Sequence, residues 1–255
     1  MKSALIGYTG FVGANLARQG SFDDQYNSKN IQDIDGKSYD LVVSAGARAE
    51  KWRINQDPET DLADLQKLKD HLLAVKTRKL VLISTVDVYK NPIGVDEDTK
   101  IDTDGLQPYG LHRYQLEQFC QENFDCLVVR LPGLFGQGLK KNVIYDFLHD
   151  NNIDKIHRGG MFQYYNLDNI WKDIQIALSN NLRLVNFAAE PVRTDAIAKA
   201  AFDMDFINEP EGTTAGLYDM KSKHADLFGG KDGYLYDKDQ TLADITAFVA
   251  AEKTN

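Results

Sequence analysis

Tyr109 and Arg113 are four residues apart, a spacing that puts two helical side chains on one face, one turn from each other. A free phenol has a pKa of about 10, so it is a poor base at neutral pH, and a fixed cation nearby lowers that pKa. The pair therefore predicts an acid–base site in which Arg113 favours the phenolate of Tyr109. The alternative is a helix on which Tyr109 packs against a neighbour and Arg113 is solvated.

Thr85 lies 24 residues before Tyr109, at the end of an apolar run. Its hydroxyl can donate to the carbonyl oxygen of a substrate while Tyr109 exchanges the proton. Asp87 follows two residues later, on the same face if the strand continues. These positions predict Thr85, Tyr109 and Arg113 as catalytic residues with Asp87 near the substrate. In the alternative, Thr85 only ends a strand and Asp87 only caps a turn.

A glycine-rich segment follows the first apolar run, with the sequence Gly7-Tyr8-Thr9-Gly10-Phe11-Val12-Gly13. GxxGxxG between a strand and a helix is the context in which dinucleotides bind. Glycines let the backbone turn tightly and approach a pyrophosphate, and the helix N-terminus offers N–H groups and the positive end of its dipole. The predicted cofactor contacts are Gly7, Thr9, Gly10, Phe11, Val12 and Gly13. A glycine-rich turn without a ligand is the alternative.

Short apolar, β-branched runs alternate with helical patterns along the chain. The strand candidates are Ser3–Ile6, Leu41–Ser44, Leu80–Ser84, Leu127–Leu131 and Leu184–Phe187, with a stunted strand at Phe22–Tyr26. One helix is predicted after Asp57, its capping residue, and another from Pro108 to about Glu122. This order predicts an α/β fold with a Rossmann-type doubly wound parallel sheet. We expect a dinucleotide-binding core at 1–135, with 160–190 returning to it, and a small C-terminal substrate lobe built from 136–160 and 190–255.

The charge balance limits the class of partner. The chain of 255 residues carries 29 basic and 38 acidic side chains, a net charge of -9. A uniformly acidic surface repels phosphate backbones and anionic membranes, so we expect neither nucleic acid nor membrane as a partner. The five histidines form no close pair, and we expect no metal site. Two cysteines without CxxC spacing fit a reducing, cytoplasmic location.

Further motifs follow the glycine loop in order. They are Ser44-Ala45-Gly46-Ala47, Leu82-Ile83-Ser84-Thr85-Val86-Asp87-Val88-Tyr89, Pro108-Tyr109-Gly110-Leu111-His112-Arg113 and Arg130-Leu131-Pro132-Gly133-Leu134-Phe135-Gly136. Over most of its length the chain resembles the extended short-chain dehydrogenase/reductase superfamily, in its branch of NAD-dependent sugar-nucleotide epimerases, dehydratases and reductases. Three positions depart from the family pattern. The lysine of YxxxK is Arg113 here, a loop asparagine is Gly133, and the arginine expected before Tyr164 is Phe162.

The resemblance implies a role for each matched segment. It implies catalysis by Thr85, Tyr109 and Arg113. It implies cofactor contacts from the glycine loop and from Ala45, Gly46, Ala47, Pro132, Gly133 and Leu134. It implies substrate contacts from Asp87, Asn142 and Tyr164. In family dehydratases two acidic residues follow the threonine directly, and Val86 at the first of these positions argues against dehydration.

Two basic stretches follow predicted strand ends or precede a predicted helix. One begins at Arg48 and includes Lys51, and the other contains Lys140 just before Asn142. Ligands bind at the carboxyl ends of strands in α/β sheets, and phosphate binds at helix N-termini. We therefore expect Arg48 and Lys140 to receive a phosphorylated substrate, with a solvated charged face as the alternative for each.

The choice between NAD and NADP depends on the residues after the second strand. An acidic residue that closes this strand would accept the ribose hydroxyls of NAD. Here the strand is followed by Asn27, Ser28 and Lys29, which can hold a 2′-phosphate. Asp33, about 20 residues beyond Gly13, would suit NAD. We favour NADP, with NAD and an exposed polar loop as alternatives.

Two functions follow from these residues. The first is an NAD(P)-dependent epimerase or reductase that acts at a keto or hydroxyl carbon of a sugar nucleotide or a similar small molecule. The second is a dinucleotide-binding sensor or partner protein with weakened catalysis, because Arg113 replaces lysine. In relatives the YxxxK helix commonly pairs across a two-fold axis, so an apolar stripe with Leu116 and Phe119 predicts a homodimer. In the alternative, that stripe faces the sheet.

Overall fold

The structure is a computed structural model that describes residues 1–254. The chain forms two compact units. Unit 1 contains residues 1–91, 99–130 and 170–185, and unit 2 contains residues 92–98, 131–169 and 186 onward. No helix within residues 1–254 is long and apolar enough to cross a membrane.

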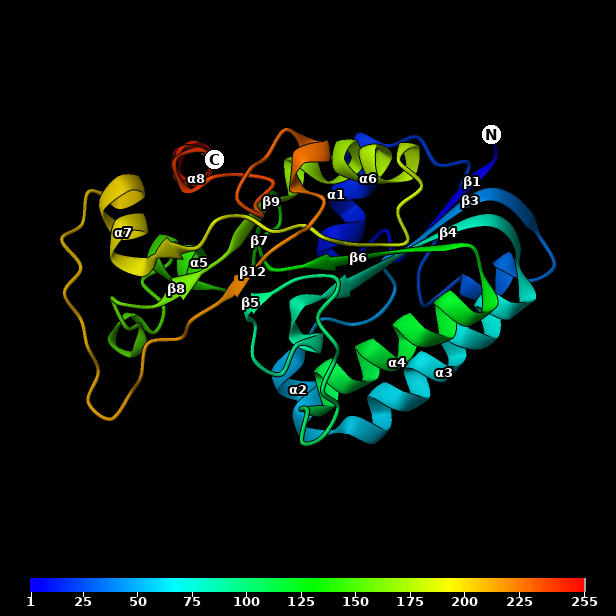
Figure 1. The fold of residues 1–255 in the computed structure, drawn as a ribbon, viewed down its shortest axis with the longest axis horizontal. Helices are drawn as coiled ribbons and strands as arrows, with labels where there is room; N and C mark the ends of the chain where they lie inside the picture. The colour runs from blue at the N-terminus through cyan, green and yellow to red at the C-terminus, as the bar shows by residue number, and fades with distance from the viewer. Residues whose placement is uncertain (255) are drawn as a thin grey trace. The chain divides into compact units, whose positions relative to one another are not determined.

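Unit 1 is built on a six-stranded, mostly parallel sheet (Figure 1). In chain order its strands are β1 (Ser3–Ile6), β2 (Asp24–Tyr26), β3 (Ser38–Ser44), β4 (Lys76–Thr85), β6 (Cys126–Leu131) and β10 (Leu184–Asn186). In space the order is β10-β6-β4-β3-β1-β2, with β1 parallel to both β2 and β3, and β3 parallel to β4. Every residue of β1 and β6 is buried, as expected for strands covered on both faces. The predicted Rossmann-type α/β sheet is confirmed.

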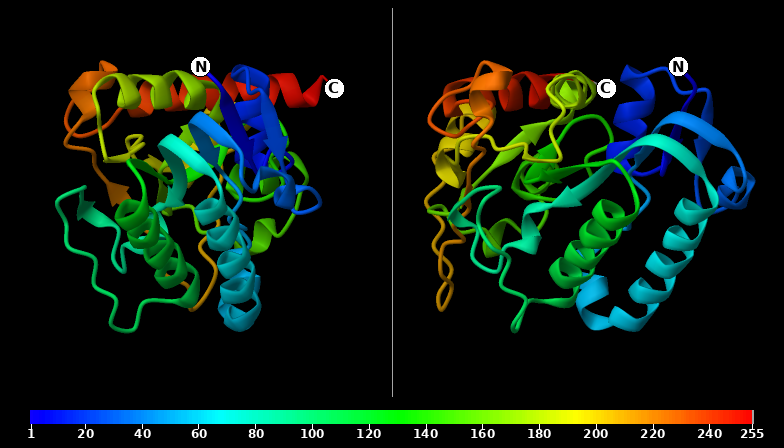
Figure 2. Two further views of the ribbon diagram at one scale, coloured as in Figure 1. Left: turned by 90° about the vertical axis from the view of Figure 1, so that its right-hand side faces the viewer. Right: turned by 45° about the vertical axis from the view of Figure 1, so that its right-hand side comes forward.

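Helices cover both faces of this sheet. In Figure 1 and Figure 2, α1 (Phe11–Gln19) and α6 (Ile170–Ser179) lie on one face, and α3 (Pro58–Ala74) and α4 (Pro108–Asn123) lie on the other. The short α2 (Lys51–Gln56) precedes α3. Both predicted helices are present, and the Asp57 carboxylate accepts the N–H of Thr60 at 3.2 Å as the cap of α3.

The apolar sides of α3 and α4 form one core with the sheet. Leu65, Leu68 and Leu72 of α3 meet Leu116 and Cys120 of α4 in this core. Phe119 is half-buried at its edge. The stripe that suggested a homodimer therefore faces the core of unit 1, and the homodimer stays a prediction.

The order of the strands changes direction at β1, because β2 lies on one side of it and β3 on the other. Ligands of doubly wound sheets bind beyond the carboxyl ends of the strands at such a point. The carboxyl ends of β1, β3 and β4 lie on neighbouring parallel strands. The glycine loop, the Ala45–Ala47 segment and Thr85 therefore follow one edge of the sheet. A short turn of 3-10 helix, η1 (Ile31–Ile34), lies between β2 and β3, and another, η2 (Val86–Val88), follows Thr85 directly.

Unit 2 is built from short paired strands and helices. Parallel pairs are β5 (Ile93–Val95) with β12 (Asp219–Met220) and β7 (Gly133–Phe135) with β9 (Tyr164–Asn166), and β8 (Met161–Phe162) pairs antiparallel with β11 (Val192–Arg193). The helices are α5 (Val143–Leu148), α7 (Thr194–Phe202) and α8 (Lys238–Lys253), with 3-10 turns at Ile153–Lys155, Leu167–Asn169 and Ala225–Phe228. The core contains Phe135, Ile144, Ile197 and Ile245.

Two polar side chains join distant segments of unit 2. The buried Gln163 amide donates to the carbonyl oxygens of Ala189 and Met220 and accepts the N–H of Met220. The Glu97 carboxylate accepts the N–H of Asn186 and the hydroxyl of Ser222, both at 2.7 Å. Such bonds satisfy the buried backbone of a unit that has little continuous sheet.

Gly110 allows α4 to approach the end of β4. A Cβ atom at this position would lie 2.0 Å from the carbonyl oxygen of Asp87. We expect Gly110→Ala to displace the first turn of α4 and to lower the free energy of unfolding by about 1–3 kcal/mol, the usual cost of overpacking. Urea denaturation measures this cost, with Gln115→Ala on the exposed side of α4 as the control. Equal stability of the two variants would contradict the close packing.

Candidate functional site

The end of β4 and the start of α4 bring three predicted residues together. The Tyr109 side chain lies close to the Thr85 hydroxyl, which acts to lower the pKa of the phenol. The Thr85 hydroxyl oxygen accepts the N–H of Asp87 at 3.2 Å and faces the Asp87 carboxylate at 3.4 Å. The strand does not continue to Asp87, because η2 begins at Val86, and this turn folds Asp87 back onto Thr85. The hydroxyls of Thr85 and Tyr109 and the carboxylate of Asp87 thus lie close together at the edge of the sheet.

Lys51 of α2 completes this group. Its ammonium nitrogen lies 2.6 Å from Oδ1 of Asp87, and the lysine side chain is 44% exposed. The neighbouring Asn55 of α2 accepts the backbone N–H of Tyr109 at 3.0 Å. Sequence reasoning placed Lys51 only in a basic stretch. The position of Lys51 just after a strand end is the one sequence feature that could have pointed to a role in the site. Its partner, Asp87, lies 36 residues further along the chain and could not be predicted from that position.

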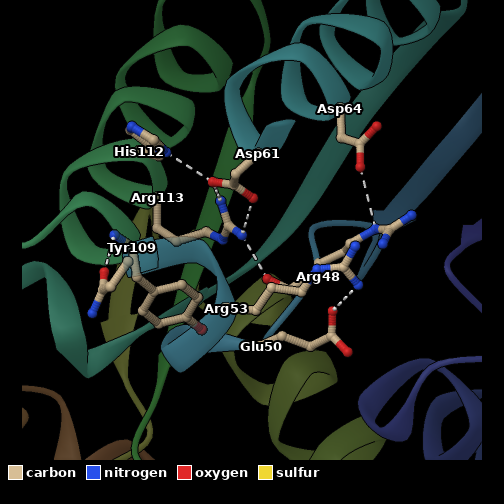
Figure 3. Close-up of polar contacts among 9 residues, drawn as sticks. Arg48, Glu50, Arg53, Asp61, Asp64, Tyr109, His112 and Arg113 are labelled. Atoms are coloured by element: carbon tan, nitrogen blue, oxygen red, sulfur yellow. Dashed lines mark hydrogen bonds and ion pairs between the residues drawn. The ribbon is translucent and has the colours of Figure 1, made fainter. Parts of the chain in front are cut away.

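Arg113 is buried and directed at protein groups (Figure 3). Its guanidinium binds both oxygens of Asp61 on α3, at 3.0 and 2.9 Å. It also donates to the carbonyl oxygen of Arg48 at 2.5 Å. Its central carbon lies 5.0 Å from the centre of the Tyr109 ring. Arg113 therefore holds the tyrosine ring and joins three segments of unit 1.

His112 shares the same carboxylate. Its Nδ1 lies 2.8 Å from Oδ2 of Asp61, and all three residues of this group are at most 5% exposed. A forked guanidinium can satisfy both carboxylate oxygens at once, which a lysine ammonium cannot do with the same geometry. Arginine at this position is therefore explained by the buried Asp61.

A second buried ion pair fixes α4 one turn beyond Arg113. The Arg130 guanidinium of β6 binds Glu117 with a shortest distance of 2.6 Å and donates to the Tyr89 hydroxyl at 2.8 Å. Ser84 of β4 donates to the same Glu117 carboxylate. Because α4 is held at Arg113 and at Glu117, the position of Tyr109 relative to Thr85 is fixed.

Burial dominates the acidity of Tyr109. It raises the pKa of this phenol above its usual value, and the Asp87 carboxylate acts in the same direction. Arg113, the Thr85 hydroxyl and Lys51 act in the opposite direction and lower the pKa. The predicted effect of Arg113 has the expected sign, but burial outweighs it. At neutral pH the phenol is protonated, the form that donates a proton.

The three glycines of the loop differ in what surrounds them. Gly7 has φ +87°, and a Cβ there would lie 2.4 Å from the carbonyl oxygen of Ala45. A Cβ at Gly13 would lie 2.0 Å from the carbonyl oxygen of Gly7. A Cβ at Gly10 would meet only Gly7, at 3.4 Å, and Gly10 caps α1 without a side chain. Gly7 and Gly13 thus serve internal packing, whereas the surface at Gly10 is open to a ligand.

The remaining loop residues of this edge are accessible. Thr9 and Gly46 are exposed, and Phe11, Val12, Ala45 and Ala47 are half-buried. Arg48 is 53% exposed, with its guanidinium 3.3 Å from Asp64. The structure therefore places the predicted cofactor residues of β1 and β3 together, and it places Arg48 next to them in the chain.

The turn after β2 exposes two of its three predicted residues. Ser28 and Lys29 are exposed, while the Asn27 amide oxygen accepts the N–H of Lys29 at 2.9 Å. Asp33 lies close to Lys37, whose pKa is raised by its hydrogen bond to Tyr26 and by nearby carboxylates that include Asp33. Lys37 directly precedes β3, so Asp33 faces the amino end of that strand.

The predicted residues of unit 2 serve its internal structure. Pro132 is buried and Leu134 half-buried, and a Cβ at Gly133 would lie 2.6 Å from the carbonyl oxygen of Gln163, because β7 pairs with β9 there. Tyr164 is 3% exposed, and burial raises its pKa. The absence of a side chain at Gly133 is thus a packing requirement.

Asn142 caps α5. Its amide oxygen accepts the N–H groups of Ile144 and Tyr145 at 3.0 and 3.2 Å, and its amide nitrogen donates to the carbonyl oxygen of Leu134. The chain itself therefore uses two of the N–H groups that were expected to meet a phosphate. Lys140 is exposed.

The ion pair of Arg113 with Asp61 gives a stability prediction. Arg113→Ala leaves a buried carboxylate without its main partner, and we expect a loss of about 3–5 kcal/mol in the free energy of unfolding. Arg113→Lys keeps the charge and should recover part of this loss. The control is Arg53→Ala, since Arg53 pairs with Glu50 on the surface at 3.5 Å, a contact worth about 0–1 kcal/mol. If urea denaturation gives Arg113→Ala and Arg53→Ala the same cost, the buried pair does not stabilise α4.

Comparison with known proteins identifies solved structures of the same fold. No protein-family model and no curated protein sequence matches the chain. The solved structures it resembles include RMD from Pseudomonas aeruginosa in complex with NADPH, at 15% identity and a TM-score of 0.72, over 99% of this chain and 100% of that one.

Two further structures are equally similar. A UDP-glucuronic acid 4-epimerase from Bacillus cereus, in complex with a fluorinated substrate analogue and NAD, has 16% identity and a TM-score of 0.72, over 100% and 99% of the two chains. The NAD-dependent NDP-hexosamine 5,6-dehydratase TunA has 14% identity and a TM-score of 0.74, over 100% and 98%. The resemblance predicted from the sequence is thus confirmed in the fold. The chain has the fold of NAD(P)-dependent epimerases, dehydratases and reductases that act on sugar nucleotides.

Proposed function

We propose that this chain is an NAD(P)-dependent oxidoreductase or epimerase that acts at a keto or hydroxyl carbon of a sugar nucleotide or a similar small molecule. The observation that carries the proposal is the contact between Tyr109 and Thr85 at the carboxyl end of β4. This pair lies on the same edge of the sheet as the glycine loop of β1. A proton donor and a dinucleotide loop on one edge are what hydride transfer to a carbonyl requires.

The residues of this chain divide the chemistry between them. A bound nicotinamide cofactor supplies or accepts the hydride. Thr85 donates a hydrogen bond to the substrate oxygen and orients it toward Tyr109. Tyr109 gives its phenolic proton to that oxygen in reduction and takes it back in oxidation. The buried, protonated phenol favours the reductive direction.

The residues present fit a dinucleotide. Gly10 leaves the first turn of α1 open, and the helix N-terminus there attracts an anion. After β2 the exposed side chains are Ser28 and Lys29, and the first acidic residue, Asp33, faces the other end of β3. A cation and a hydroxyl suit the additional phosphate of NADP, and we propose NADP over NAD.

The second candidate is a dinucleotide-binding sensor with weakened catalysis. It is favoured by Arg113, whose buried guanidinium donates to Asp61 and to the carbonyl oxygen of Arg48. An assay for oxidation of NADPH across a panel of keto sugars separates the two, because a sensor binds the cofactor without turnover.

A substitution in the glycine loop tests the proposed binding of NADPH. The backbone of Gly10, at φ -80°, accepts any residue, so Gly10→Val should fold with a loss of about 1 kcal/mol for the poorer helix cap. Its branched side chain would fill the open surface, and we expect calorimetry to detect no NADPH binding. Ala14→Val, one turn further along α1, is the control. Parental affinity in a folded Gly10→Val would remove the basis of the dinucleotide site.

Tyr109→Phe tests the proton donor. The variant keeps the ring against Arg113, so cofactor binding should persist, while turnover should fall by about 10²–10⁴-fold. Because the neutral phenol is the acid and its pKa is raised, kcat/KM for reduction should stay constant from neutral pH up to the usual phenol range and fall only above it. Near-parental turnover of Tyr109→Phe on an accepted substrate would exclude this mechanism.

A further inference from the structure

Tyr109 acquires a negative charge each time it gives up its proton, and its surroundings must accept that charge. The side chain is 7% exposed, so water solvates the phenolate poorly. Arg113 contacts the face of the ring, and its donors are directed at Asp61 and the carbonyl oxygen of Arg48. The positive charge of Arg113 is therefore shared with a carboxylate on α3.

The charged groups near Tyr109 come from four elements. Arg113 lies on α4 itself, Asp61 on α3, Asp87 on η2 and Lys51 on α2. Asp87 binds Thr85, the partner of Tyr109, so its carboxylate would oppose a phenolate beside it. The ammonium of Lys51, at 2.6 Å from Asp87, neutralises this carboxylate.

We propose that Lys51 is a positioning residue for the acid–base step. Its ammonium neutralises Asp87, so that the phenolate of Tyr109 does not face an unpaired carboxylate. This inference rests on the proposed function. The role that the resemblance gives to a lysine one turn after the tyrosine is thereby divided in two. Arg113 holds the ring, and Lys51, from a different helix and on the solvent side, balances the charge.

The sign of the effect can be measured without substrate or cofactor. A ring-fluorinated tyrosine at position 109 makes the phenol more acidic and reports its ionisation by fluorine NMR. Lys51→Met should raise the pKa at position 109 by about one unit, because Asp87 is then unpaired. Asp87→Asn should lower it. The double variant should return close to the parent, and Lys51→Arg should restore the parental pKa.

Lys79→Met is the matched control. Lys79 pairs with Asp125 at 2.8 Å and lies six residues before Thr85 on β4, about 20 Å along the strand. It should leave the titration unchanged. In the oxidative direction, the pH dependence of kcat should move to higher pH in Lys51→Met by the same shift, while the affinity for NADPH measured by calorimetry stays parental.

The outcomes separate this inference from the proposed function. If Lys51→Met and Asp87→Asn both leave the titration at position 109 where it was, the inference is wrong even if the enzyme turns over. If the titration shifts as expected in a protein that turns over no substrate, the charge pairing stands and the proposed function fails. If Lys51→Met does not fold, Lys51→Gln should raise the pKa at position 109 and Asp87→Asn should lower it.

Discussion

The buried carboxylate of Asp61 is the constraint on which the site depends. Removing a charge from water is costly unless it is paired and hydrogen-bonded, and Asp61 meets this requirement through His112 and Arg113 of α4. These bonds allow one placement of α3 against α4. Because Tyr109 is one turn before Arg113 and stacks on it, the same bonds fix the phenol beside Thr85.

The pairing of Arg113 with Asp61 affects the acidity of Tyr109. The Arg113 guanidinium donates to Asp61 and to the carbonyl oxygen of Arg48, so its charge is partly compensated, and it lowers the pKa of Tyr109 less than burial raises it. Burial therefore keeps the phenol neutral. Lys51 of α2 lowers the pKa of the phenol in addition to Arg113 of α4. The ion pair of Lys51 with Asp87 lies where such a contribution is needed.

Local patterns predicted the parts of the fold that local physics determines. The apolar runs placed the strands, Asp57 and Pro58 placed the start of α3, and the glycine spacing placed the turn between β1 and α1. The partners of Arg113 and Lys51 were not predictable in this way. They lie 52 and 36 residues away, and the packing of α2 and α3 decides which carboxylates they meet. The cap formed by Asn142 was readable, since asparagine before a helix commonly accepts its first N–H groups.

Asp87 bears on which reaction the site can perform. A base that removes a proton from carbon, as dehydration requires, needs a carboxylate that is directed at the substrate. Here one oxygen of Asp87 binds the Lys51 ammonium and the other faces the Thr85 hydroxyl. Val86 precedes Asp87, at the position where the dehydratases of the family that this sequence resembles have a further acidic residue. In the proposed function, the carboxylate supports Thr85 and Tyr109, and the hydroxyl pair is the proposed acid–base group. Such a pair moves a proton to or from oxygen, which favours reduction or epimerisation through a keto carbon over loss of water.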